Sequence, residues 1–507
     1  MPTFTPTEEQ QAIVAAALGR SESLLVRAFA GCAKTTTLEL IGAALPSDVP
    51  VLALAFNVKI KKELELRFPD HVSVLTLNGL GHRAWGKAIG KRLTLDTKKL
   101  GRLTSAVFAA EGFHQGKDDW IVVKTLAEKA MQLGLVPKPY TQRGLVEDTQ
   151  EVWEEISFDE GLQASKAHLS FAHDVLCASI AEGTSGVISF DDQIYLSALF
   201  GGSFPRFPIV MVDESQDLSP LNHIQVRRSC AGRLIVVGDE KQAIYAFRGA
   251  DFESIAKLRA LRSDWLELPL ATTFRCPKAI VARQQEHVPG FKAWEGCKEG
   301  AIIHLPQGRF APPTWCWDEI EHIAAGGSIA VLCRNNAPLV SFAFKLLSLG
   351  VGCHMLGRDI GKGLERLLKK LAPDESLGIE HVLRAIRTWR EHQCALALAN
   401  DNDSKIEKIT DQADCLVAVA STDTRTAGAL RSRLVELFSR DAGLVTLSTG
   451  HRAKGLEWDT VLHLDPQRVP SRFARSESAL AQEMNLLYVI ETRSKNILIN
   501  AKLEDFE

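Results

Sequence analysis

The sequence predicts an α/β protein whose two lobes are built on mostly parallel β-sheets, each interrupted by a mainly helical insert. Short apolar runs typical of buried strands alternate with helical patterns along most of the chain. One early run leads through a small loop that contains a lysine into a helix, and a later run ends in two acids. Strand ends of a parallel sheet meet at one edge, where ligands bind, so we expect these two features to form one site.

The bulk properties are those of a soluble globular protein. The 507 residues are 46% hydrophobic and carry a net charge of −3, so charge alone does not indicate a nucleic-acid partner. A chain of this length is expected to divide into about three or four domains. No apolar run is long enough to cross a bilayer, and the first residues lack a signal-peptide pattern. The ten cysteines are scattered without a Cys-x-x-Cys pair, which favours reduced thiols, a cytoplasmic location and no zinc or iron–sulfur site.

The order of strand-like and helical segments defines the lobes and inserts. The first lobe is expected at 1–90 and 186–267 with its insert at 91–185, and the second at 268–360 and 441–507 with its insert at 361–440. The predicted strands are residues 23–26, 51–56, 72–77, 187–192, 207–212, 234–239, 301–305, 328–333, 443–447, 460–464 and 496–500.

A phosphate-binding loop is predicted where the first apolar run enters a helix. Its residues are Ala28, Phe29, Ala30, Gly31, Cys32, Ala33, Lys34, Thr35 and Thr36. Backbone N–H groups would surround the phosphates, Lys34 would reach the β- and γ-phosphates, and the Thr35 hydroxyl would bind Mg²⁺. Ala28 and Ala33 stand where the consensus has glycine, and Ala33 is the harder case because glycine there allows close approach to phosphate. The alternative is an ordinary strand–helix junction with a surface lysine.

Two acids follow the apolar run 207–212 directly. Asp213 can hold Mg²⁺, and Glu214 can polarise the attacking water of a phosphate hydrolysis. A charged turn at a strand end is the alternative, and the upstream phosphate-binding loop disfavours it. The two elements together predict an ATP and Mg²⁺ site.

Five further segments resemble one known family. They are residues 76–83, 238–251, 273–277, 451–458 and 485–495, and the most specific is the run Gln-Ala-Ile-Tyr-Ala-Phe-Arg-Gly-Ala-Asp that begins at Gln242. Together with the two elements above, they resemble the UvrD/Rep group of superfamily 1 DNA helicases over nearly the whole chain, and the compact layout resembles phage or F-box-type relatives. The resemblance implies two RecA-like lobes with ATP in the cleft and single-stranded DNA across the top.

The resemblance also implies roles at the nucleotide. Gln10 would read the adenine edge, Phe274 would stack on the ring and Glu457 would hold the ribose. Gln242 resembles the sensor of the γ-phosphate, and Arg275 and Arg493 resemble the arginines that the second lobe supplies to it. The alternatives are a solvated helix start for Gln10, a core position for Phe274 and surface positions for the arginines.

For DNA, the resemblance implies base stacking and backbone contacts. Phe56, Tyr245 and Phe247 match the aromatic positions on which bases stack without regard to sequence. Arg248 and His451 would contact the backbone or support the aromatic side chains, and Asn78 stands where relatives often carry histidine. Without the resemblance, Tyr245 and Phe247 would be interpreted as core residues.

The function expected from this resemblance is an ATP-dependent, Mg²⁺-requiring DNA helicase that moves 3′→5′ on single-stranded DNA in replication, repair or recombination. Its expected partners are single-stranded DNA, duplex junctions and replication or repair proteins; we expect a monomer without membrane contact, in the cytoplasm or nucleoid, or in the host cytoplasm for a phage protein. One alternative is a DNA-stimulated ATPase that strips bound proteins and unwinds weakly. Another is a catalytically silent DNA-binding subunit, which would not need Lys34, Asp213 and Glu214.

Overall fold

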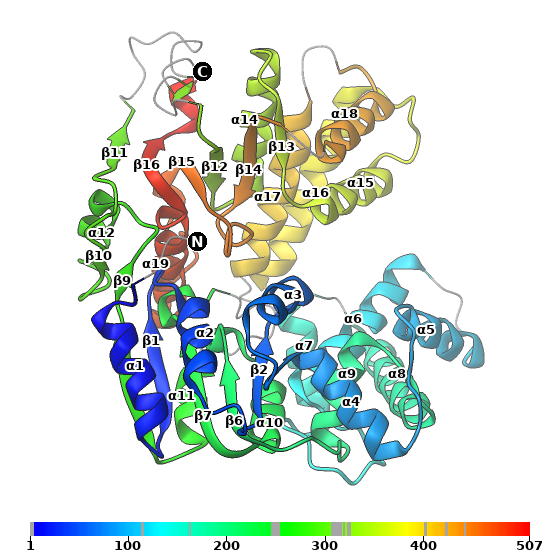
Figure 1. The fold of residues 1–507 in the computed structure, drawn as a ribbon. Coiled ribbons are helices and arrows are strands. Elements are labelled where there is room, and N and C mark those ends of the chain that lie inside the picture. Colours follow the sequence, from blue (N-terminus) through cyan, green and yellow to red (C-terminus); the bar gives the residue numbers. More distant parts are fainter. Residues whose placement is uncertain are drawn as a thin grey trace. The chain divides into compact units, whose positions relative to one another are not determined.

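The computed structural model describes residues 5–112, 116–160, 162, 164–244, 254–305, 317, 320–321, 326–399, 403–420, 424–440 and 443–506. The chain divides into two compact units (Figure 1). The first comprises Met1–Phe29 and Ala33–Ala271, and the second comprises Ala30–Cys32 and Thr272–Glu507. Among the described residues, no helix has the length and apolar character that a membrane span needs.

The first unit is built on a six-stranded parallel sheet with the order β3-β2-β6-β7-β1-β8 (Figure 1). Its strands are β1 (Ser23–Ala28), β2 (Val51–Ala55), β3 (Val72–Thr76), β6 (Phe207–Val212), β7 (Cys230–Gly238) and β8 (Trp265–Leu270). The helices between and after them are α1 (Glu8–Gly19), α2 (Lys34–Ala44), α3 (Val58–Arg67), α4 (Leu77–Ile89), α9 (Phe190–Leu199), α10 (Pro220–Ser229) and α11 (Ser254–Ala260). Strand β2 is buried along its full length, as expected of an interior strand in a sheet covered on both faces.

The first insert is helical, as predicted. It comprises β4 (Thr94–Leu95), α5 (Lys99–Ala110), α6 (Lys117–Leu133), α7 (Gln150–Asp159), α8 (Lys166–Ser185) and β5 (Val187–Ile188). Helices α5 to α8 form one hydrophobic cluster with α4, α9 and α10, whereas the sheet strands carry a separate cluster. The insert is therefore supported by the helices of its lobe.

The predicted strand 187–192 is wrong beyond its first two residues. Strand β5 pairs only with β4, outside the main sheet, and α9 begins at Phe190. The reason is a capping box, in which Ser189 Oγ accepts from the Asp192 N–H at 3.1 Å and Asp192 Oδ2 accepts from the Ser189 N–H at 2.7 Å. Two satisfied helix-start donors thus outweigh the strand propensity of the apolar run.

The second unit carries another six-stranded parallel sheet, with the order β11-β16-β15-β12-β14-β13 (Figure 1). Its strands are β11 (Ala301–His304), β12 (Ile329–Cys333), β13 (Cys353–Met355), β14 (Val445–Thr449), β15 (Trp458–Leu464) and β16 (Ser494–Ala501), and a small parallel pair is formed by β9 (Thr272–Thr273) and β10 (Lys292–Ala293). The helices are α12 (Lys278–Gln284), α14 (Asn336–Ser348), α15 (Arg358–Leu371), α16 (Ile379–Ala399), α17 (Asp403–Val419), α18 (Ala427–Ser439) and α19 (Glu477–Glu491). The second lobe was expected from residue 268, but β8 pairs with β1, so residues 268–270 belong to the first sheet.

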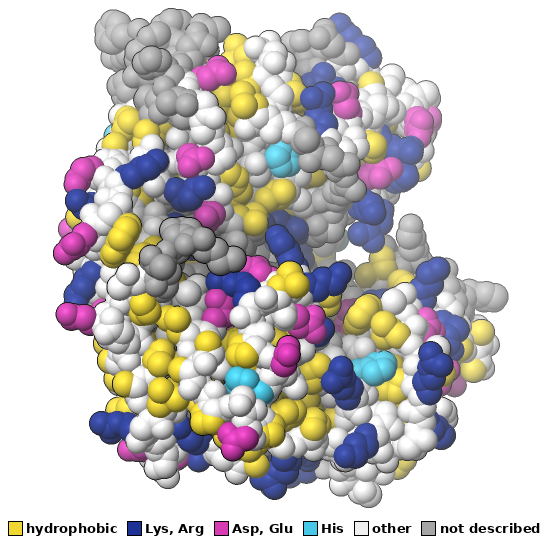
Figure 2. All heavy atoms as spheres, in the orientation of Figure 1, with side chains coloured by type: hydrophobic (Ala, Val, Ile, Leu, Met, Phe, Trp, Pro, Cys, Tyr) yellow, Lys and Arg dark blue, Asp and Glu magenta, His cyan; other side chains and the backbone are white. Residues whose placement is uncertain are grey.

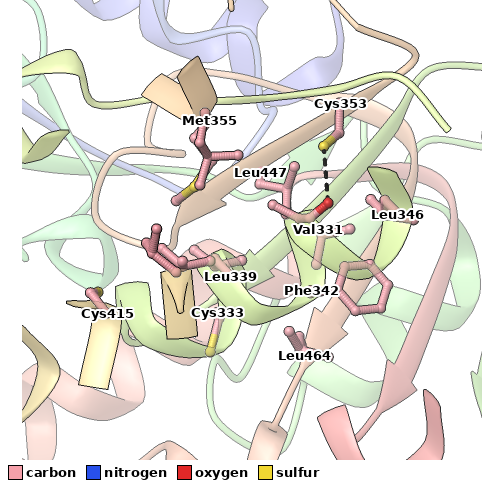
Figure 3. Close-up of a cluster of buried hydrophobic side chains, with 14 of the residues drawn as sticks. Val331, Cys333, Leu339, Phe342, Leu346, Cys353, Met355, Cys415, Leu447 and Leu464 are labelled. Carbon is pink, nitrogen blue, oxygen red and sulfur yellow. Dashed lines mark hydrogen bonds between the residues drawn. The ribbon is translucent and has the colours of Figure 1, made fainter. Parts of the chain in front are cut away.

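Helices α15 to α18 lie in the predicted second insert and share one hydrophobic core with the sheet of the second unit. Leu416 and Leu434 are fully buried in the same cluster as Val331 and Val445 of the strands, and Figure 3 shows part of this cluster. The carboxylate of Asp411 in α17 also accepts from the backbone N–H groups of Asn336 and Ala337 at the start of α14. The second insert is thus continuous with its lobe.

Candidate functional site

The phosphate-binding loop has the strand–loop–helix form that its sequence predicts. Ala28 is the last residue of β1, a regular strand position that needs no glycine, and Lys34 is the first residue of α2. Ala33 caps the helix with φ 56° and ψ 43°, in the left-handed region that costs an L-residue about 1–2 kcal/mol. The glycine of the consensus therefore has a conformational role here, and Ala33 adopts the same backbone at a cost.

The remaining loop residues lie as follows. The Phe29 N–H donates to the Leu270 carbonyl at 3.2 Å, and the Thr36 hydroxyl accepts from Arg67 at 3.3 Å. Ala30, Gly31 and Cys32 are grouped with the second unit, where the Ala30 N–H donates to Tyr488 Oη at 2.7 Å. Gly31 has φ 70°, a value that glycine adopts freely.

Lys34 faces the acids that follow β6. Its Nζ lies 3.2 Å from Glu214 Oε2, and its side chain is only 10% exposed. Burial by itself lowers the pKa of Lys34, but the carboxylates of Glu214, Asp239 and Asp213 outweigh it and raise the pKa. The lysine is therefore positively charged, as a phosphate ligand must be.

Thr35 and Asp213 meet at the same place. The Thr35 hydroxyl donates to Asp213 Oδ2 at 2.7 Å, and burial raises the pKa of Asp213 to about 6. A hydroxyl and a carboxylate oxygen side by side are the ligand types that Mg²⁺ takes, so these two residues fit the ion. Among the described residues, no group of three or more His, Cys, Asp or Glu side chains could hold a metal.

A chain of buried hydrogen bonds connects the acids to Gln242. Gln216 donates to Glu214 Oε2 at 2.6 Å and accepts from the Asp239 N–H at 3.0 Å. Gln242 donates to Asp239 Oδ2 at 2.6 Å, and burial raises the pKa of Asp239 to about 6. Glu214 and Gln242 are singled out by the sequence, but Gln216 and Asp239 are not, although Gln216 lies two residues after Glu214 and Asp239 ends the predicted strand 234–239.

Gln10 lies close to the loop but is fully buried. Its side-chain oxygen accepts from the Thr7 N–H at 3.0 Å, and its amide donates to Thr37 Oγ1 at 3.1 Å. The residue thus completes the capping box of α1 and ties that helix to α2. Its assignment to adenine stays a prediction.

The predicted nucleotide residues of the second unit fall into three environments. Arg275 forms an ion pair with Glu457 at 2.5 Å, so the structure brings these two together. Arg493 is 1% exposed, and its guanidinium donates to the carbonyls of Val489 and Leu456. The Phe274 ring contacts that of Trp294, with centroids 5.8 Å apart. Their assignments to ribose, γ-phosphate and adenine stay predictions.

The predicted DNA residues that the structure describes are partly exposed. Phe56 at the end of β2 is 47% exposed, and Asn78 donates to the Phe190 carbonyl at 2.9 Å. His451 follows β14 and is half-buried. Tyr245, Phe247 and Arg248 lie outside the described residues.

Phe190 is an exposed aromatic residue that the sequence did not single out. It is the first residue of α9 and is 54% exposed, and its backbone carbonyl accepts from Asn78. A contact between residues so far apart along the chain gives no local sequence signal. On the face drawn in Figure 2, Lys and Arg side chains are dispersed among Asp and Glu, in keeping with the net charge of −3.

Two segments of the chain match models of known helicase domains. The UvrD/REP helicase N-terminal domain matches residues 199–261, which include both acids and Gln242, and the UvrD-like helicase C-terminal domain matches residues 395–504. These two matches, together with the similarity to F-box DNA helicase and UvrD proteins, support a UvrD-like helicase of superfamily 1.

Individual relatives show how far the similarity extends. F-box DNA helicase protein 1 of Schizosaccharomyces pombe is 26% identical over 97% of this chain and 57% of its own length. F-box DNA helicase 1 of Gallus gallus is 24% identical over 97% of this chain and 48% of its own length. The ATP-dependent DNA helicase UvrD1 of Mycobacterium leprae is 23% identical over 65% of this chain and 46% of its own length. The chain thus spans about half the length of these relatives.

Proposed function

We propose that the chain is an ATP-dependent DNA helicase or translocase that moves 3′→5′ on single-stranded DNA. The observation that supports this most strongly is the convergence of Lys34, Thr35, Asp213 and Glu214 at the carboxyl ends of β1 and β6. A lysine at a helix start beside a hydroxyl–carboxylate pair and a second carboxylate is a site for nucleoside triphosphate hydrolysis.

The residues of this site divide the chemistry among them. Lys34 would leave Glu214 and bind the β- and γ-phosphates, and Thr35 and Asp213 would hold Mg²⁺. The ion, when bound, would neutralise charge that develops on the phosphate oxygens. Glu214 would hold the attacking water in line with the γ-phosphate and accept a proton from that water.

The DNA track would use the exposed aromatic residues of the first unit. Phe56 and Phe190 present ring faces on which bases can stack without regard to sequence, and Asn78 can donate to a phosphate or base. Stacking of this kind suits a motor that must move through any sequence. Replication, repair or recombination is the proposed setting, with duplex junctions and repair or replication proteins as partners.

A DNA-stimulated ATPase that strips bound proteins and unwinds weakly is the second candidate. The continuous core that α15 to α18 share with the second sheet favours it, because these helices are built as part of the lobe and not as a separate module. Duplexes with a 3′ or a 5′ single-stranded tail separate the candidates: unwinding of the 3′-tailed substrate alone supports the helicase, and tail-dependent displacement of a bound protein without unwinding supports the second.

Replacement of the loop lysine tests the ATP site itself. Lys34→Ala should abolish ATP hydrolysis and leave much of the affinity for an oligo(dT) strand, because Phe56 and Phe190 do not depend on the lysine. Lys166→Ala, at an exposed lysine of the first insert, is the matched control and should hydrolyse ATP normally. Normal hydrolysis by Lys34→Ala would show that the phosphate-binding assignment is wrong.

A further inference from the structure

Gln216 uses both ends of its side chain to connect the ends of two neighbouring strands. It is 2% exposed and lies two residues after Glu214, in the short helix η1 (Ser215–Asp217) that follows β6. Its amide nitrogen donates to Glu214 Oε2 at 2.6 Å, and its amide oxygen accepts from the N–H of Asp239, directly after β7, at 3.0 Å. The side chain therefore fixes the carboxylate relative to the neighbouring strand.

The surrounding packing leaves Gln216 little freedom. A Cβ at Gly238 would lie 2.3 Å from Ser215 Oγ and 3.0 Å from Gln216 Oε1, so only glycine permits this close approach. On the other side, Ser254 Oγ donates to the Ser215 carbonyl at 2.7 Å and lies 3.0 Å from His223 Nε2. The short helix is thus held from two directions.

Glu214 needs such support because of its backbone and its other partner. Its φ of 50° lies in the left-handed region, which is uncommon for a residue with a side chain and persists only where the surrounding structure holds it. Its Oε2 also faces Lys34, and that contact has to be given up when the lysine binds phosphate. The hydrogen bond from Gln216 does not depend on the lysine.

We infer that Gln216 is a positioning residue, which holds the Glu214 carboxylate in place for the attacking water and links it through Asp239 to Gln242. The inference rests on the proposed function. Glutamine suits this role because its amide donates to a carboxylate at one end and accepts at the other without carrying charge. Asparagine would be one methylene too short to make both contacts.

Two substitutions at Gln216 test the role by steady-state ATP hydrolysis in the presence of oligo(dT). Gln216→Leu removes both hydrogen bonds; Gln216→Asn stays polar and uncharged but is one methylene too short to make both contacts. Both should lower kcat about 10- to 100-fold, the usual cost of a misplaced catalytic group, with the KM for ATP changed less than about twofold. Gln216→Asn guards against simple unfolding of the leucine variant, because it leaves no buried polar group facing an apolar side chain.

Gln225 provides a matched control. It is a fully buried glutamine of α10 in the same unit, and its amide donates to Ser197 Oγ at 3.1 Å, away from the acids. Gln225→Leu should lower the melting temperature and leave kcat per folded molecule unchanged. The inference is overturned if both Gln216 variants keep the wild-type kcat, or if Gln225→Leu loses as much kcat as they do. Absence of ATP hydrolysis in the wild type would instead refute the proposed function and this role together.

Discussion

Ala33 shows how one side chain can make a phosphate-binding loop less stable than its consensus. Its left-handed backbone disfavours a Cβ, and glycine would remove that strain while it adds freedom to the unfolded chain. We predict that Ala33→Gly stabilises the protein by about 0.5–1 kcal/mol, measured as a rise in melting temperature.

Ala28 is the matched control for this change, because it stands at the other consensus glycine but lies in a regular strand. Ala28→Gly should destabilise the protein by about 0.5–1 kcal/mol. If the two substitutions changed the stability by the same amount and in the same direction, backbone conformation would not explain their effects.

Because His463 is buried, the folding stability of the protein should decrease in acid. It lies in β15 with no exposed surface and no partner for either ring nitrogen among the described residues, and burial lowers its pKa to about 4. The unfolded chain binds a proton below a pH of about 6.5, whereas the folded ring stays neutral, so folding stability falls as the pH decreases from 6.5 to 4. The loss contributed by this ring should reach about 3 kcal/mol.

His463→Leu should remove this contribution and flatten the dependence of melting temperature on pH in that range. Carboxylates titrate in both proteins, so their contribution to the pH dependence is the same and cancels in the comparison. Parallel pH profiles for wild type and variant would mean that the ring is protonated inside the fold.

At the scale of elements, the first insert depends on a buried ion pair. Lys99 Nζ donates to Asp192 Oδ2 at 2.6 Å and to the Ser179 carbonyl at 2.7 Å, and both charged side chains have no exposed surface. Burial lowers the pKa of Lys99 even though the Asp192 carboxylate acts to raise it, so the buried charge is costly. Lys99→Met should therefore destabilise the protein by about 3–5 kcal/mol, because it leaves a buried carboxylate unpaired.

The double variant Lys99→Met/Asp192→Asn should recover much of that loss, since the buried negative charge is removed while the asparagine can still cap α9. Denaturant unfolding of the wild type, both single variants and the double variant measures the coupling. If the loss of unfolding free energy in the double variant equals the sum of the losses in the two single variants, Lys99 and Asp192 do not stabilise the fold through each other.

The sequence was sufficient for most elements and for the strand–loop–helix order around Lys34, because those signals are local. Apolar runs, the loop before α2 and the acids after β6 all depend on residues a few positions apart, and the assignment of the loop to phosphate stays a prediction. The strand 187–192 was misassigned because a capping serine outweighed an apolar run. The bridge made by Gln216 could not be predicted, because it depends on how β6 and β7 pair in the sheet. The local sequence of either strand does not determine that pairing.

At the scale of whole units, the two inserts should differ in how they unfold. The helices of the second insert share a core with β12 and β14, whereas those of the first form a cluster separate from that of the sheet. Leu416→Ala in α17 should cost about 2–5 kcal/mol and increase hydrogen exchange in β12 and β14 as well as in the helix.

Leu126→Ala in α6 is the matched substitution for the first insert, also at a fully buried leucine. Its effect on hydrogen exchange should be confined to the helical cluster and should leave β1 and β7 protected. Loss of protection limited to α15–α18 in Leu416→Ala would contradict the shared core of the second unit.

DNA-driven ATP hydrolysis at the site of the first unit is the property on which the proposed function depends most. The most direct measurement is the rate of ATP hydrolysis with and without single-stranded DNA for wild type, Glu214→Gln and a control, Glu240→Gln, at a partly exposed glutamate paired with Arg27 and Arg259. We predict strong stimulation by DNA in the wild type and in Glu240→Gln, and its loss in Glu214→Gln. Absence of turnover in the wild type under both conditions would contradict the account and favour a catalytically silent DNA-binding subunit.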